Sequence, residues 1–264
     1  MRPNTRNLSA LAATIVWLSG AMFSLAATIN EIRIDQGGSD NDEYFELAGA
    51  PAESLDGLSY IVIGDGAGVG AGGAVETIVN LMGLTIPSDG YFLAVEDTFT
   101  LSGSADLTLT GTGTSQTLNF ENSDNVTHLL VQGLNPAIHT GDGFGGNATD
   151  LDADDDGTID AIGDWNGDTV FDGAPWAAIL DSVVLSEDVP SGDLVYSSTV
   201  VGPDGTFVPG HVFRFPNVSG DWHIGEFNAG TEDTPGVANV PEPGTITAAL
   251  ICLLALAALC RRSH

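Results

Sequence analysis

Short apolar segments, each ended within a few residues by glycine, proline, asparagine or aspartate, constrain the fold of this chain more than any other feature. Apolar and polar residues alternate in Ile32-Arg33-Ile34 and in Tyr44-Phe45-Glu46-Leu47, as they do in a strand with one buried face. Turn-forming sequences such as Asp56-Gly57 and Pro203-Asp204-Gly205 lie between the segments. No convincing helical period occurs before residue 245. The pattern predicts an all-β sandwich.

Ten segments have the length and the β-branched and aromatic content of strands. They are residues 28–34, 43–47, 59–63, 76–81, 91–95, 107–110, 128–131, 178–185, 194–196 and 211–215. The longest interval without such a segment lies between Gly133 and Trp176, and we expect a loop insertion at about residues 134–175.

The charge of the chain argues against two classes of partner. The sequence has no lysine, six arginines and 36 acidic residues, for a net charge of −30. Residues 27–240 hold two of the arginines and 35 of the acidic residues. Such a surface repels nucleic-acid phosphates and anionic lipid, and it has no cationic stripe from which counterions could be released. Cations are the expected partners, and part of the negative charge can serve solubility in salty surroundings.

The first 26 residues have the features of a secretory signal peptide. Two arginines give a positive start, an apolar stretch follows over residues 8–25, and Ser24 and Ala26 are the small residues that signal peptidase requires. We expect cleavage after Ala26, so that the exported chain begins at Ala27. An uncleaved membrane anchor is the alternative.

The other end has the features of a membrane-targeting tail. It begins with the motif Pro241-Glu242-Pro243. An apolar run of 16 residues follows at 245–260, and two arginines, Arg261 and Arg262, come after it. The run is just short of the ~20 residues that span a bilayer comfortably. Arginines tend to stay cytoplasmic, which places residues 27–240 on the other side of the membrane.

This tail resembles the PEP-CTERM sorting signal of Gram-negative bacteria, whose three parts occur here in the same order over residues 240–264. The resemblance implies recognition by an exosortase-type membrane protease. The protein would first be anchored in the inner membrane on the periplasmic side. It would then be released to, or displayed at, the cell surface, often among exopolysaccharide. An ordinary tail anchor would give the same topology.

Four further motifs frame the exported part of the chain. They are Ile29-Asn30-Glu31-Ile32, Asp42-Glu43-Tyr44-Phe45-Glu46-Leu47, Leu55-Asp56-Gly57-Leu58-Ser59-Tyr60 and Thr234-Pro235-Gly236-Val237-Ala238-Asn239. Together they resemble the opening and closing motifs of a lamin-tail-type domain, an immunoglobulin-like sandwich, over residues 27–239. The resemblance implies the fold and leaves the function open, because sandwiches of this kind host many roles.

Aspartates alternate with other residues between Asp150 and Asp172, and the pattern repeats after twelve residues. In the first repeat, positions one, three and five are Asp152, Asp154 and Asp156, position six is Gly157, and positions eight and nine are Ile159 and Asp160. In the second repeat, positions one, three and five are Asp164, Asn166 and Asp168, and positions eight and nine are Phe171 and Asp172. Alternate carboxylates in a tight loop can converge on calcium, which takes six to eight oxygens at ~2.3–2.6 Å. We expect the apolar residue at position eight to tether each loop to a core.

The two repeats resemble the Asp-rich loops of thrombospondin type 3 repeats and dockerins rather than a full EF-hand, because Gly163 stands where an EF-hand has glutamate. The resemblance implies one site of Asp152, Asp154, Asp156, Asp160, Asp164 and the Thr158 carbonyl, and a degenerate second site of Asp164, Asn166, Asp168 and Asp172. Both cysteines, Cys252 and Cys260, lie in the C-terminal apolar run, so no disulfide can hold the insertion. We expect calcium to hold it. A solvated acidic loop is the alternative.

The sequence offers no catalytic motif, having neither a Gly-x-Ser-x-Gly elbow nor histidines at metal-binding spacing. We therefore expect a non-catalytic surface or matrix protein. One alternative is a secreted hydrolase or nuclease that uses His139 with Asp142. Another is a carbohydrate-binding module in which Trp165, Trp176 and Trp222 stack on sugars.

Overall fold

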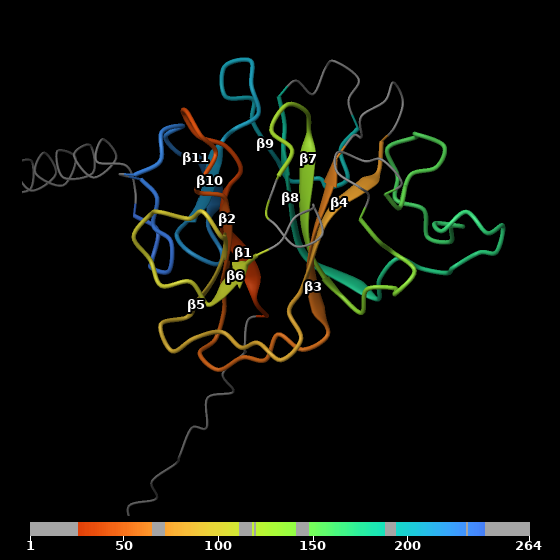
Figure 1. Cartoon of the computed structure of the whole chain (residues 1–264), viewed down its shortest axis with the longest axis horizontal. Helices are drawn as coiled ribbons and strands as arrows, with labels where there is room; N and C mark the ends of the chain where they lie inside the picture. Colours follow the sequence, from red (N-terminus) through yellow and green to blue (C-terminus); the bar gives the residue numbers. More distant parts are fainter. Residues whose placement is uncertain are drawn as a thin grey trace, which may run out of the picture.

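The computed structural model describes residues 26–64, 72–110, 118, 120–140, 148–187, 194–230 and 232–240. Within these residues eleven strands form two sheets that pack as a sandwich (Figure 1). The larger sheet has the order β11-β10-β1-β2-β5-β6, and the smaller sheet has the order β4-β3-β7-β8-β9. Neighbouring strands are antiparallel, except that β6 runs parallel to β5 and β9 parallel to β8. The expectation of an all-β sandwich is confirmed.

Most of the strands coincide with expected segments. In the larger sheet the strands are β1 Thr28–Arg33, β2 Tyr44–Ala48, β5 Tyr91–Glu96, β6 Leu107–Leu109, β10 His211–Phe215 and β11 Asp221–Ile224. In the smaller sheet they are β3 Leu58–Gly64, β4 Ala74–Asn80, β7 Val126–Gln132, β8 Ala178–Leu185 and β9 Val200–Val201.

The differences between expectation and structure lie at the sheet edges. The strand expected at residues 194–196 does not form, and β9 instead extends the smaller sheet through two residue pairs with β8. Strand β11 was not expected, because its four residues are too few for periodicity to separate them from a loop. Both edge strands rely on a longer neighbour for their hydrogen bonds.

The two expected sorting segments fall almost entirely outside the described residues. Of the signal peptide at residues 1–26 only Ala26 is described, and the tail from Pro241 onward is not. Across the described part of the chain, no helix has the length and apolar character that a membrane crossing needs. The membrane helix expected at residues 245–260 lies outside that part.

The smaller sheet is buried on both faces, which explains why its strands are nearly continuous apolar runs. In β3, Tyr60 and Val62 belong to the core between the sheets, whereas Ile61 and Ile63 belong to a second core on the outer face. The ring of Tyr60 stacks on Phe45 of β2, with centroids 3.7 Å apart and planes 4° apart. This stack joins the two sheets.

The insertion between β7 and β8 covers the outer face of the smaller sheet (Figure 1, green). Leu129 and Val131 of β7 pack there with Leu151 and Trp165 of the insertion, and each of these side chains is at most 6% exposed. The described parts of the insertion are therefore a packed layer. Their attachment keeps water from the outer face of the sheet.

The motifs at the beginning and the end of residues 27–239 meet beside β1. Asn30 Nδ2 donates to Glu46 Oε1 (2.7 Å), and the Gly236 N–H donates to Glu46 Oε2 (2.7 Å). Thr234 donates from its hydroxyl to Glu31 Oε2 (2.7 Å) and from its N–H to Glu31 Oε1 (3.0 Å). Burial, together with the nearby Glu31 charge, raises the pKa of Glu46 well above its usual range. The C-terminal segment thus closes on the first two strands through buried carboxyl groups.

Arg33, fully buried in β1, supplies positive charge to this region. Its Nε and Nη2 donate to the two carboxylate oxygens of Asp233 (2.6 and 2.8 Å). Its remaining donors reach the carbonyls of Asp35, Glu226 and Phe227. Burial alone would raise the pKa of Asp233, but the Arg33 bonds and the nearby positive charge hold it below its usual value.

We expect Arg33→Met to lower the free energy of unfolding by about 3–5 kcal/mol, because it leaves the Asp233 carboxylate buried without its partner. Urea unfolding at neutral pH measures the loss. The double variant Arg33→Met, Asp233→Leu removes both charges and should regain a large part of the stability. An equal loss in the single and double variants would contradict this role for the ion pair.

Candidate metal centre

The first Asp-rich loop is built around the carboxylate of Asp152, a residue that is fully buried. Asp152 Oδ1 accepts the N–H of Asp156 (3.1 Å), and Oδ2 accepts the N–H of Gly157 (2.8 Å). The Asp152 carbonyl accepts the N–H of Asp155 (3.0 Å). Asp155 and Gly157 have φ values of 53° and 81°, in the left-handed region, and these two residues turn the chain back around Asp152.

The second loop repeats this structure twelve residues further on. Asp164 Oδ1 accepts the N–H of Asp168 (2.9 Å), and Oδ2 accepts the N–H of Thr169 (2.5 Å). The Asp164 carbonyl accepts the N–H of Gly167 (3.4 Å). Gly167 and Thr169 have φ values of 74° and 69°, as their counterparts do in the first loop. The sequence repeat is therefore also a backbone repeat, although threonine replaces glycine at position six.

Position nine closes both loops in the same way. Asp160 Oδ2 accepts the N–H of Ala153 (3.2 Å) in the first loop, and Asp172 Oδ2 accepts the N–H of Trp165 (3.0 Å) in the second. The carboxylates at positions one and nine thus serve the loop backbone. Those at positions three and five of the first loop, Asp154 and Asp156, are exposed.

Three of the predicted ligands come together. Carboxylate oxygens of Asp152, Asp154 and Asp156 lie within 4.8 Å of one another. The charge of Asp156 is the largest of several causes that raise the pKa of Asp154. A carboxylate oxygen has two lone pairs, so Asp152 Oδ1 keeps one after accepting the Asp156 N–H. An all-oxygen set with such mutual repulsion suits a hard cation.

The other predicted ligands are placed differently. Thr158 is exposed, and Asp160 already accepts one backbone hydrogen bond. In the second loop, Asn166 Nδ2 donates to Asp172 Oδ1 (3.3 Å), so two of the four ligands predicted there are bonded to each other. The sorting-signal residues Pro241, Glu242, Pro243, Arg261 and Arg262 lie outside the described residues.

Contacts that the sequence does not indicate hold the first loop in place. The Tyr196 hydroxyl, from the segment after β8, donates to Asp152 Oδ2 (2.9 Å). The N–H of Gly72, just before β4, donates to Asp155 Oδ1 (3.0 Å). Gly73 has φ +79°, and a Cβ there would lie 2.6 Å from the Asp152 nitrogen, so only glycine fits. Burial, followed by the hydrogen bond to Asp152, raises the pKa of Tyr196 well above its usual value.

The tether at position eight is observed in one loop only. Ile159 of the first loop is half-buried and packs against the outer core. Phe171 of the second loop is 75% exposed, and its neighbours Ile162 and Val170 are 63% and 62% exposed. The expectation that position eight tethers each loop is therefore wrong for the second loop, which is joined to the molecule by Trp165 in the outer core and by backbone and side-chain hydrogen bonds.

A second acidic group, Glu31 with His211 and Asp233, has the proximity of a metal site, but its side chains are already bonded to donors within the fold. Glu31 Oε1 accepts bonds from the Tyr44 hydroxyl (2.5 Å) and the Thr234 N–H (3.0 Å), and it lies 2.9 Å from His211 Nε2. Asp233 is paired with Arg33 through both oxygens. A guanidinium at this position disfavours a cation, so this group serves the fold.

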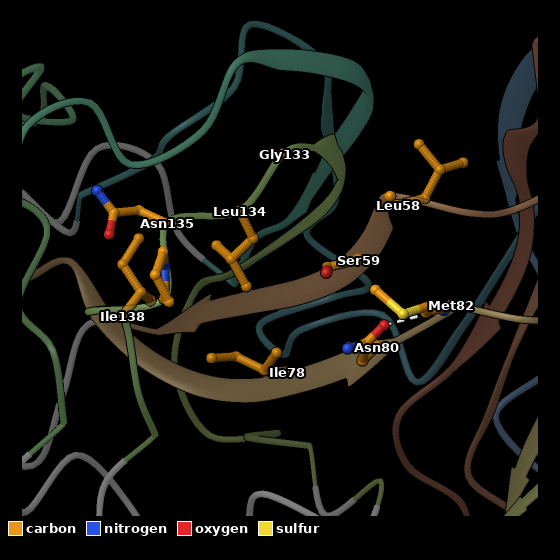
Figure 2. Close-up of a pocket in the computed structure, with 11 residues that line it drawn as sticks. Leu58, Ser59, Ile78, Asn80, Met82, Gly133, Leu134, Asn135 and Ile138 are labelled. Carbon is orange, nitrogen blue, oxygen red and sulfur yellow. Dashed lines mark hydrogen bonds between the residues drawn. The ribbon is translucent and has the colours of Figure 1, made fainter.

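A cavity of about 270 Å³ lies at one end of β3 and β4, beside the turn that follows β7 (Figure 2). Figure 2 shows Leu134 and Ile138 on one side of it and Asn80 and Met82 on the other. Asn135, also on its wall, donates from Nδ2 to the carbonyls of Asp172 and Ala174 (2.8 and 3.2 Å). This wall is therefore bonded to the end of the second loop.

A second cavity, of about 380 Å³, is lined by Asp35, Asn122, Asp204, Phe207, Val208 and Phe227. Phe207 is 73% exposed and Phe227 is 43% exposed. Phe207 ends a tight turn in which its N–H and carbonyl both bond to the backbone of Asp204 (3.1 and 2.9 Å). Two exposed aromatic rings therefore border a cavity that also contains carboxylates and an amide.

The three tryptophans considered for sugar stacking do not share a surface. Trp165 and Trp176 pack in the outer core, whereas Trp222 packs against the main core beneath the Arg214 guanidinium, 4.5 Å from its carbon. Of the hydrolase pair, His139 is described and Asp142 lies outside the described residues.

No protein-family model, curated protein or solved structure matches this chain. The function is therefore inferred from the residues and their geometry.

We expect Thr169→Gly to stabilise the second loop by about 1 kcal/mol, because a β-branched residue is disfavoured in the left-handed region that this position requires. Thermal unfolding of the purified protein measures the change. Thr158→Gly is the matched control, since Thr158 has no positive φ and should lose about 0.5–1 kcal/mol on becoming glycine. A loss of stability in both variants would contradict the structural equivalence of the loops.

Proposed function

We propose that this protein is an exported, non-catalytic cell-surface or extracellular-matrix protein whose sandwich is stabilised by calcium. The observation that carries the proposal is the convergence of Asp152, Asp154 and Asp156 in a loop that packs on the outer core. Ligands from the Thr158 carbonyl, Asp160 and Asp164 would complete the shell. Oxygen donors alone, without nitrogen or sulfur, favour calcium over a transition metal.

Calcium in this loop would act on the fold rather than on a substrate. Carboxylates ~4 Å apart repel one another by about 1 kcal/mol per pair even in water, and a bound divalent ion reverses that interaction. Leu151 precedes the loop, Ile159 lies within it, and both pack on the smaller sheet. An ion that fixes the loop would therefore also stabilise the packing of the insertion. An extracellular module of this kind typically has a Kd of ~10⁻⁴–10⁻³ M.

The proposal also includes the type of sandwich and the cellular location of the protein. Contacts between Asn30, Glu31 and Glu46 and the closing segment support a lamin-tail-type, immunoglobulin-like sandwich, because the residues of the sequence motifs are those that bond. Signal peptidase would process residues 1–26 and an exosortase-type protease the tail at 240–264. Exopolysaccharide at the cell surface is the proposed surroundings.

We expect calcium to raise the free energy of unfolding by about 2.7 kcal/mol at a hundredfold excess over Kd. Differential scanning calorimetry of the exported protein, with calcium and then with a chelator, measures this. The double variant Asp154→Asn, Asp156→Asn should lose the calcium response and still fold, because both side chains are exposed.

The matched control is Asp204→Asn, which removes an acidic group outside the loops and should keep the full response. A melting temperature that is the same in calcium and in chelator would contradict the calcium proposal. A calcium-induced increase in stability that is equally large in the loop variant would show that calcium binds outside this loop.

Carbohydrate binding is a second candidate function, favoured by the cavity between Phe207 and Phe227. Aromatic rings stack on the apolar faces of sugars, and Asp35, Asp204 and Asn122 offer hydrogen-bonding groups for hydroxyls. The negative charge of the chain favours a neutral rather than an acidic saccharide.

We expect Phe207→Ala to weaken binding of a neutral oligosaccharide by about fivefold to tenfold, through loss of the stacking ring. Isothermal titration with the hits of a glycan array provides the measurement. Phe171→Ala is the control, because Phe171 is equally exposed but lies in the second Asp-rich loop. Equal weakening by both substitutions, or no array hits, would argue against this site.

A further inference from the structure

Ala27, the residue after the expected signal-peptidase site, is placed unlike the residue before it. Ala26 is exposed, whereas Ala27 is fully buried and belongs to the core between the sheets. The nitrogen of Ala27 donates to Glu53 Oε1 (3.0 Å). The other carboxylate oxygen, Glu53 Oε2, accepts the N–H of Ala50 (3.0 Å), so the carboxylate is fixed in place.

The position beside Ala27 in the neighbouring strand has little room for a side chain. Thr28 pairs with Ala48, which puts Ala27 beside Gly49. A Cβ on Gly49 would lie 3.3 Å from the Ala27 Cα and 2.9 Å from Glu53 Oε2. Within the described residues, burial therefore begins at Ala27, on the carboxyl side of the bond that the small residues Ser24 and Ala26 mark for cleavage.

We propose that cleavage between Ala26 and Ala27 creates an α-ammonium group that forms an ion pair with Glu53, so that export itself completes the N-terminal edge of the sandwich. Hydrolysis of the bond leaves the carboxylate on Ala26 and the amine, which takes up a proton, on Ala27. The same nitrogen that donates as an amide in the full chain then carries a positive charge. This inference rests on the proposed export and is independent of calcium.

Charge and composition both favour the pair. Residues 27–240 contain two arginines, and one of them, Arg33, is fully buried and paired with Asp233. An ammonium at Ala27 adds a third positive charge where a carboxylate is already positioned. The Ala27 nitrogen has Glu53 Oε1 as its acceptor, and Gly49, which brings no charge, lies beside Ala27 in the strand register.

The absence of lysine makes the proposal directly testable, because the α-amine is the only primary amine of the exported chain. The protein is exported from a Gram-negative host, purified, and its first residue identified by mass spectrometry. It is then treated with an acetylating ester, which attacks only the uncharged amine. We expect Ala27 as the first residue, and acetylation about tenfold slower in the native protein than in urea, because pairing favours the charged form.

Glu53→Gln should make native-state acetylation several times faster, and Glu121→Gln should not change it. Glu121 is the matched control because it is also half-buried and also bonds a backbone N–H of its own turn, that of Ser123. Where the Glu53 variant does not fold, the pH dependence of acetylation of the wild-type protein tests the pair, because an ion pair raises the pKa of the amine above its value in urea, whereas burial lowers it. An amine pKa that is not raised in the native protein would contradict the pair. A different first residue, or equal rates for the wild-type and Glu53→Gln proteins, would overturn the proposal.

Discussion

The buried carboxylate of Asp152 is the interaction on which the outer half of the molecule depends. It accepts hydrogen bonds from two backbone groups of its own loop and from the Tyr196 hydroxyl. A carboxylate is costly to bury unless donors or a cation compensate for the lost water, so these bonds are a condition of the loop's position. Three segments far apart in sequence, at Gly73, Asp152 and Tyr196, are thereby joined at one point.

The position of this loop matters because the smaller sheet has two apolar faces. The larger sheet covers one face, and residues of the insertion, such as Leu151 and Trp165, cover the other. In a secreted domain a disulfide would often hold such a layer, but residues 27–240 contain no cysteine. The first Asp-rich loop, in this layer, provides the hydrogen bonds described above. An ion bound there would add to the stabilisation that these bonds give.

Local pattern predicted the sandwich well because its strands have strong local signals. The run at Ala178–Leu185 was expected with the same bounds, since it is rich in β-branched residues and followed by turn residues. The twelve-residue repeat likewise predicted two related loops, and the structure shows left-handed residues at position six of both, although threonine occupies that position in the second. What local pattern could not predict was long-range pairing. Nothing near Tyr196 in the sequence points to Asp152, and Phe171 fits the apolar pattern but has no core within reach.

The absence of lysine connects these features, because it leaves the chain short of positive charge. A domain with 35 acidic residues and two arginines over residues 27–240 cannot neutralise its own carboxylates by pairing them internally. Buried acids such as Glu46 therefore bond to N–H groups, and burial raises the pKa of Glu46. Exposed ones such as Asp154 and Asp156 repel one another. Further positive charge has to come from outside the folded sequence, and the two sources proposed above are a divalent ion and the amine that signal-peptide cleavage would create. Under the proposed function both would be met only beyond the inner membrane, and a chain of this composition would then reach its full stability only after export.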